Sequence, residues 1–162
     1  MATILAHIVI REGKEAEFES IAATLHEASH ADEARLRAYG YGRAAAPRTY
    51  DTHLAFDDYL AFLAHQTSDH HENAAPHLRE CIESMSLEWV DPVEGASKLA
   101  ASHPQDMPAD APPLVVRYAE RFPVAVAEWW GALRRARSSP PSTRSPPPRR
   151  RRRSIPSEQW PL

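Results

Sequence analysis

The segment "AHQTSDHHE", residues 64–72, gathers side chains that could do chemistry. It holds His65, Asp69, His70, His71 and Glu72. Imidazoles and carboxylates at this density can bind a metal ion or exchange protons with a substrate. They can also form a polar turn between two helices, because Ser68 and Asp69 are good N-cap residues. Glu72 stands one residue beyond the capping-box position relative to Ser68, so the polar-turn interpretation stays open beside the two chemical ones.

The spacing argues against a metal site. His70 and His71 are neighbours, about 100° apart on a helix, so they do not easily face one ion. His65 and Asp69 would share a face only if one helix ran unbroken through both. There is no H-E-x-x-H spacing and no cysteine pair, and no G-x-G-x-x-G follows the first predicted strand. We therefore expect no metal, flavin or nicotinamide cofactor.

The elements that position this segment lie in an acidic N-terminal part of the chain. Residues 1–107 carry 8 Lys+Arg and 18 Asp+Glu, whereas residues 108–162 carry 11 Arg and 4 Asp+Glu. Proline shows the same break, with 4 residues before position 108 and 11 from there on. The composition predicts four regions. These are a folded domain (1–97), a Pro-rich linker (98–113), a helical extension (114–137) and a disordered Pro/Arg-rich tail (138–162).

Hydrophobic periodicity predicts alternating strands and helices in the domain. The predicted strands are Thr3–Arg11, Arg35–Arg43, Thr49–Phe56 and Ser86–Val93. A helix is expected over about 15–29, a second one capped by Asp58, and a further helical stretch divided into two pieces by Pro76. The order β-α-β-β-α-β is the ferredoxin-like pattern of an α+β domain.

The first strand bears on the assembly of the protein. Leu5, His7 and Val9 point one way, and the alternating residues Ile4 to Ile10 point the other way. Both rows are mostly apolar, so both sheet faces are expected to be buried, and a second copy is the simplest cover for the face without helices. This predicts a homodimer, with His7 and His53 facing the partner.

The compartment and the C-terminal part allow broader expectations. Cys81 is the only cysteine, no apolar run approaches the ~18 residues of a membrane span, and no signal peptide is recognisable, which favours a cytoplasmic protein. Trp129 and Trp130 lie on an apolar stripe that could pack on the domain or cover its pocket. Five arginines, 149–153, could bind nucleic acid, but no RNA-binding pattern accompanies them, so a solvated tail is expected.

The domain resembles the antibiotic biosynthesis monooxygenase family, which includes quinol monooxygenases and heme-degrading enzymes. The likeness covers about residues 3–93 and is most specific from Asp58 to His71, "DYLAFLAHQTSDHH", with support from "PRTY" at 47–50. It implies a dimeric α+β barrel. It also implies oxidation of a quinol or phenolic small molecule by molecular oxygen without a cofactor.

The resemblance further implies a pocket between the sheet and its helices. It places Thr52, Leu54 and Phe56 on the pocket side of the third strand, and Phe62 shares a helix face with His65. His65 is the first candidate for the proton acceptor and His71 the second, because the pKa of imidazole lies near working pH. The competing interpretation of His65 is a histidine stabilised by the dipole at a helix end.

Some residues depart from the family pattern. Leu54 stands where relatives commonly carry Glu, and the places of the heme-degrading residues hold Ala6, His65 and Ala75. Heme degradation is therefore not expected. Two functions remain open: a cofactor-independent monooxygenase, and a non-catalytic dimeric barrel that binds a small molecule or a partner. The first requires a dry pocket containing His65, and the second predicts a filled core.

Overall fold

The computed structural model describes residues 1–93, 95–103 and 105–121. The elements are β1 (Ala2–Ile10), α1 (Glu15–Asp32), β2 (Leu36–Arg43), β3 (Thr49–Phe56), α2 (Tyr59–Gln66), α3 (Asp69–Cys81), β4 (Ile82–Val90) and α4 (Pro113–Arg121). This order confirms the predicted α+β, ferredoxin-like class, with two helices in the second crossover. The predicted tail, the part of the helical extension beyond residue 121 and the Trp129–Trp130 stripe lie outside the described residues.

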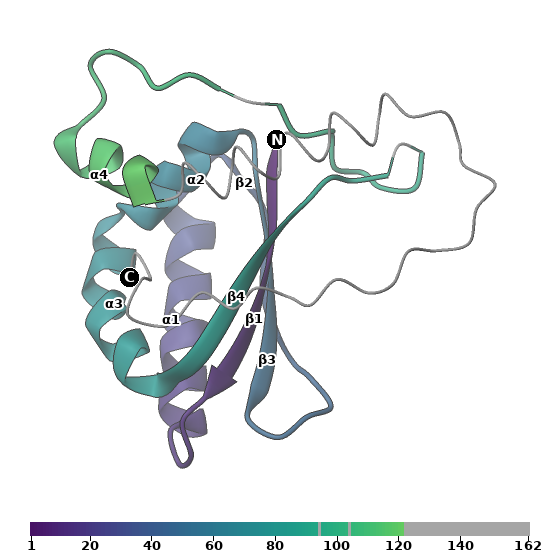
Figure 1. Cartoon of the computed structure of the whole chain (residues 1–162), viewed down its shortest axis with the longest axis vertical. Coiled ribbons are helices and arrows are strands. Elements are labelled where there is room, and N and C mark those ends of the chain that lie inside the picture. Colours follow the sequence, from purple (N-terminus) through teal and green to yellow (C-terminus); the bar gives the residue numbers. More distant parts are fainter. Residues whose placement is uncertain (94, 104, 122–162) are drawn as a thin grey trace.

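The four strands form one antiparallel sheet in the order β2-β3-β1-β4, and α1, α2 and α3 lie together on one face of it (Figure 1). Along β1, Ile4, Ala6, Ile8 and Ile10 are buried beneath the helices. The alternate row, Leu5, His7 and Val9, is only half-buried. In the single chain, therefore, only the helix-side row is fully covered, and the expectation that both rows are buried is not met without a partner.

Side-chain caps set the boundaries of the second crossover. The Asp58 carboxylate accepts a hydrogen bond from the backbone N–H of Ala61 at 2.9 Å and begins α2. Thr67 ends that helix, and the Ser68 hydroxyl accepts a bond from the backbone N–H of His71 at 3.4 Å to begin α3. Both predicted caps are confirmed, and the break at residues 67–68 turns the chain between His65 and His70.

The division at Pro76 was a wrong prediction, because α3 is one helix with Pro76 inside it. An interior proline costs about 3 kcal/mol through a lost hydrogen bond and a steric clash. The helix nevertheless buries Ala75, Leu78 and Cys81, which offsets that cost. Since β4 begins at the next residue, the last strand starts four residues before the predicted Ser86 and ends at Val90 rather than Val93.

The core lies between the sheet and the helices. Ile8, Phe18, Leu25 and Leu78 belong to one buried cluster. A second buried cluster includes Ile4, Phe56, Phe62 and Tyr118. Cys81, where α3 meets β4, is fully buried, and burial raises the pKa of its thiol.

The helix α4 packs against α2. Its buried Tyr118 donates a hydrogen bond from its hydroxyl to the Glu72 carboxylate on α3, so the described part of the predicted extension is attached to the domain. None of the helices described combines the length and the apolar character needed to cross a bilayer.

Candidate functional site

A cavity of about 70 Å³ lies between the sheet and the helices, where the resemblance places the pocket. Most of its lining is apolar and comes from the inward rows of the strands and from α1, α2 and α3. Its polar side chains are Tyr39, Tyr41, Thr52, His65, Gln66 and His71. Of the predicted site residues, Thr52, Leu54, Phe62, His65 and His71 line this cavity. Phe56 does not.

Phe56 instead lies behind the cavity wall. Its ring is buried, with its centroid 5.2 Å from that of His65 and 5.9 Å from that of Phe62. It also lines a separate outer hollow between the end of α1 and the α2–α3 turn. In this structure Phe56 therefore supports the position of the His65 ring and makes no wall for a ligand in the cavity.

His65 stands in the last turn of α2, with a side chain that is 1% exposed. Its Nδ1 lies 2.9 and 3.0 Å from the two carboxylate oxygens of Glu33. A carboxylate only accepts hydrogen bonds, so Nδ1 must carry the proton and, in the neutral ring, Nε2 keeps the lone pair. His65 thus has the arrangement of a general base whose orientation is fixed by a carboxylate.

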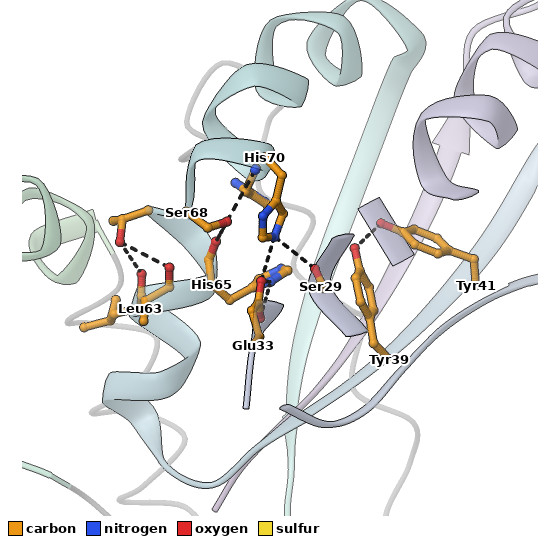
Figure 2. Close-up of polar contacts among 11 residues, drawn as sticks. Ser29, Glu33, Tyr39, Tyr41, Leu63, His65, Ser68 and His70 are labelled. Carbon is orange, nitrogen blue, oxygen red and sulfur yellow. Dashed lines mark hydrogen bonds and ion pairs between the residues drawn. The ribbon is translucent and has the colours of Figure 1, made fainter. Parts of the chain in front are cut away.

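Glu33 is the C-cap residue of α1, and its carboxylate also contacts a second imidazole, that of His70. Nε2 of His70 lies 2.7 Å from Oε1 of Glu33 and 3.2 Å from the Ser29 hydroxyl (Figure 2). Burial acts to raise the pKa of Glu33, but the hydrogen bonds from His65 and His70 outweigh it, and the pKa falls below its ordinary value. Glu33 is therefore ionised at neutral pH.

His71 is buried on the cavity wall, and its ring centroid lies 5.1 Å from that of His65. Burial, together with the nearby His65 and His70, lowers the pKa of His71 to about 3, so the ring is neutral. Its ring also hydrogen-bonds the Gln66 backbone, while Nδ1 has no partner among the described residues. Nδ1 is consequently a buried acceptor that a ligand could satisfy.

Two tyrosines on β2 supply hydroxyl donors to the same cavity. The hydroxyl oxygens of Tyr39 and Tyr41 lie 2.5 Å apart, and both rings line the wall. Burial raises the pKa of Tyr41 to about 12 and that of Tyr39 well above its ordinary value, so both stay protonated at neutral pH. One hydroxyl donates to the other, which leaves the accepting hydroxyl with a proton to donate elsewhere.

Glu33, Tyr39 and Tyr41 were not among the site residues expected from the sequence. A usable signal existed for the tyrosines, because a hairpin across residues 44–48 sets Tyr41 opposite Thr52 and Tyr39 opposite Leu54. Residues paired across strands share a face of the sheet. Because Thr52 and Leu54 were expected on the helix side, their partners Tyr41 and Tyr39 should lie on that side as well. No such local pattern marks Glu33, which lies 32 residues from His65.

Among the residues described, two groups of side chains could hold a metal ion: Glu33 with His65 and His70, and Glu17 with His77 and Glu80. The first is largely buried and includes a cavity residue. In the second, His77 and Glu80 are exposed. The spacing argument correctly separated His70 from His71, but it did not anticipate that the turn would bring His70 to His65 through Glu33.

Comparison with known proteins finds one family model that matches the N-terminal part of the chain. Residues 1–76 match the family model described as antibiotic biosynthesis monooxygenase. No functionally curated protein matches the chain.

Three solved structures illustrate the shared fold. PA3566 from Pseudomonas aeruginosa aligns with a TM-score of 0.53 and 16% identity, over 57% of this chain and 93% of that one. A protein described as antibiotic biosynthesis monooxygenase aligns with a TM-score of 0.53 and 17% identity, over 57% of this chain and 99% of that one. Rv0793 from Mycobacterium tuberculosis aligns with a TM-score of 0.54 and 15% identity, over 59% of this chain and 98% of that one. At these identities the likeness establishes the fold alone.

Proposed function

We propose that this protein, whose residues 1–76 match the antibiotic biosynthesis monooxygenase family model, oxidises a quinol or related phenolic small molecule with molecular oxygen and without a cofactor. The observation that carries the proposal is the Glu33–His65 pair at the wall of a mostly apolar cavity. A general base next to a water-poor cavity is what such a reaction requires of a protein.

The proposed reaction begins with proton removal. Nε2 of His65 accepts a proton from a phenolic hydroxyl, and the Glu33 carboxylate stabilises the imidazolium that forms. The accepting hydroxyl of the Tyr39–Tyr41 pair can donate to a substrate oxygen as negative charge develops. Nδ1 of His71 can accept a second hydroxyl proton of the substrate in a hydrogen bond.

The electrons for oxygen come from the substrate itself. A deprotonated quinol is electron-rich enough to reduce molecular oxygen. Conversion of a quinol and one O₂ into a hydroxyquinone and one water conserves atoms and electrons. One oxygen atom enters the ring, the other leaves as water, and no external reductant is needed.

The cavity volume bears on how a substrate enters. An engineered protein cavity of about 150 Å³ holds benzene, whereas this cavity measures about 70 Å³. An aromatic ring therefore needs side chains of the wall to move before it can bind. The presence of a cavity that includes His65 supports the monooxygenase over a non-catalytic protein with a filled core, which is the alternative function.

The deciding experiment is oxygen uptake by chelator-treated, full-length protein with a panel of quinols. The panel runs from hydroquinone to naphthalene-1,4-diol, and autoxidation without protein supplies the baseline. We expect uptake above that baseline for at least one quinol, with one atom of ¹⁸O₂ in the product. Uptake equal to the baseline for every member, combined with saturable binding of the same quinols, would instead support the non-catalytic alternative.

We propose a homodimer in which the half-buried row of β1 faces a second copy. On that face, Nδ1 of His7 lies 2.5 Å from a carboxylate oxygen of Asp51, and Nε2 lies 3.6 Å from one of Glu88. The covered surface would therefore be partly charged. The single, buried Cys81 is consistent with the reducing cytoplasm that we propose as the compartment.

A further inference from the structure

Three segments bring metal-ligating side chains to one point (Figure 2). Glu33 caps the end of α1, His65 lies in the last turn of α2, and His70 lies in the first turn of α3. One ring nitrogen of each histidine and one Glu33 oxygen all lie within 4.8 Å of one another. The side chains are 1%, 18% and 14% exposed for His65, His70 and Glu33, so this cluster is largely shielded from solvent.

The donor set matches a known class of metal. Two imidazoles and one carboxylate are ligands of zinc and of other divalent first-row metals, and three protein ligands leave a fourth position open. Tetrahedral coordination with bonds of about 2.0–2.1 Å sets ligand atoms roughly 3.4 Å apart. The contacts of His70 and His65 with Oε1 of Glu33 are 2.7 and 2.9 Å long, so these atoms would move apart by about 0.5–0.7 Å.

Neighbouring side chains already orient these ligands. The Ser29 hydroxyl hydrogen-bonds the Glu33 carboxylate and helps to hold it in place. The Ser68 hydroxyl donates to the backbone carbonyl of His65 at 2.8 Å, which fixes the end of α2. Support of this kind from outside the ligand set is typical of metal centres, where it holds ligands in their binding geometry.

An ion could reach the cluster from outside without entering the cavity. The outer hollow between the end of α1 and the α2–α3 turn is lined by all three ligands. Asp32 and Asp69 line it as well. The positively charged Arg35 also lines it, but its guanidinium is paired with the Asp58 carboxylate. The hollow therefore offers a cation an approach with an excess of negative charge.

We propose that Glu33, His65 and His70 bind a zinc-class divalent metal ion, and that its binding inhibits the oxidation proposed above. The ion takes the Nδ1 lone pair of His65, so the ring proton moves to Nε2 and that nitrogen no longer accepts a proton. The proposed metal binding does not depend on the proposed function, whereas the proposed inhibition rests on that function.

The primary test measures Zn²⁺ binding to chelator-treated, full-length protein by calorimetry, with Co²⁺ absorption as a spectroscopic second readout. We expect one site of at least micromolar affinity and visible Co²⁺ bands of a four- or five-coordinate ion. His70→Ala should weaken binding at least about tenfold, as loss of a direct ligand should cost no less than loss of a supporting residue. His77→Ala, which removes the exposed histidine of the second group, is the matched control and should bind normally.

Two results would overturn the binding part. One is no Zn²⁺ binding by a protein whose circular dichroism and melting temperature match a folded domain. The other is binding that is lost in His77→Ala and kept in His70→Ala, which would assign the metal to the surface group. If His70→Ala does not fold, Glu33→Gln, which keeps a similar shape and removes the charge, replaces it in the same comparison.

Activity separates the second part from the first. Zn²⁺ at saturating concentration should reduce quinol-dependent oxygen uptake at least about tenfold, in proportion to occupancy of the site. Metal binding with undiminished uptake would overturn inhibition while leaving the site. Uptake that requires the metal would overturn both inhibition and the cofactor-free function. Binding by a protein with no uptake at all would retain the site and refute the inhibition together with the proposed function.

Discussion

Glu33, which ends α1, lies 2.9 Å from Nδ1 of His65, which lies in the last turn of α2. The two residues are 32 positions apart, and their contact places a charged carboxylate directly behind an imidazole on the cavity wall. This pair makes His65 chemically different from an ordinary histidine at a helix end, because its tautomer and its orientation are both fixed.

Replacement of His65 tests that difference. His65→Ala should lower quinol turnover by about 10²-fold or more, which is the usual contribution of a positioned acid–base group. The measurement is oxygen uptake per protein under single-substrate saturation. His26→Ala, which removes an exposed histidine on α1, should keep normal turnover. An unchanged rate for His65→Ala would move the role of proton acceptor to His71.

Removal of one tyrosine hydroxyl tests the donor pair. Tyr41→Phe should lower kcat by about 10²-fold, the lower end for loss of a donor to developing negative charge. Tyr59→Phe is the matched control, since Tyr59 is also partly buried, with a pKa raised to about 12 by burial, but does not line the cavity. Equal effects of the two substitutions would indicate a packing role for Tyr41.

Acid should destabilise the domain through His71. Its folded pKa of about 3 lies below the ordinary value of 6.5, so the unfolded chain binds a proton between these values that the folded chain does not. Stability therefore falls as the pH drops below about 6.5 and continues to fall toward 3. Melting temperatures from pH 7 to 5 should fall less steeply in His71→Asn than in the natural sequence.

The exposed His53 supplies the control for that measurement. His53→Asn makes the same substitution at an exposed histidine of β3 and serves as the reference variant. If His71→Asn and His53→Asn show the same pH slope as the natural sequence, His71 is not held neutral by burial.

The uncovered sheet face predicts an assembly. Static light scattering should give about twice the chain mass of 18.2 kDa. Val9→Arg places a charge on the half-buried row of β1 and should shift the protein toward monomer. Asn73→Arg, on an exposed position of α3, should remain dimeric. A monomer for the natural sequence at micromolar concentration would contradict the dimer.

Much of the fold followed from local patterns. Period-two alternation located β3 to the residue, and the caps Asp58 and Ser68 marked the starts of two helices. The prediction failed at Pro76, where burial of the neighbouring apolar face outweighs a local preference. Interactions between distant segments were equally hidden, since nothing near His65 in the sequence indicates that α1 ends beside it with a carboxylate.

The residues that line the cavity could be predicted where the alternation of side chains along a strand or helix fixes the face on which they lie. Thr52, Leu54, Phe62, His65 and His71 were expected at the pocket, and all five line the cavity. The displacement of Phe56 could not be foreseen, because alternation fixes the side of a sheet and says nothing about depth beneath a helix. The roles of these five cavity residues as base, hydrogen-bond acceptor or wall remain predictions, which the measurements above would test.

The burial of Cys81 at the α3–β4 junction gives the molecule an internal reporter of its own opening. It is the only cysteine, its side chain is fully buried, and burial raises the pKa of its thiol. A thiol reagent can therefore label the chain only in the fraction of time when the junction opens. The labelling rate, followed by mass, would measure the free energy of that opening without an added probe, and a ligand that enters the cavity should slow it.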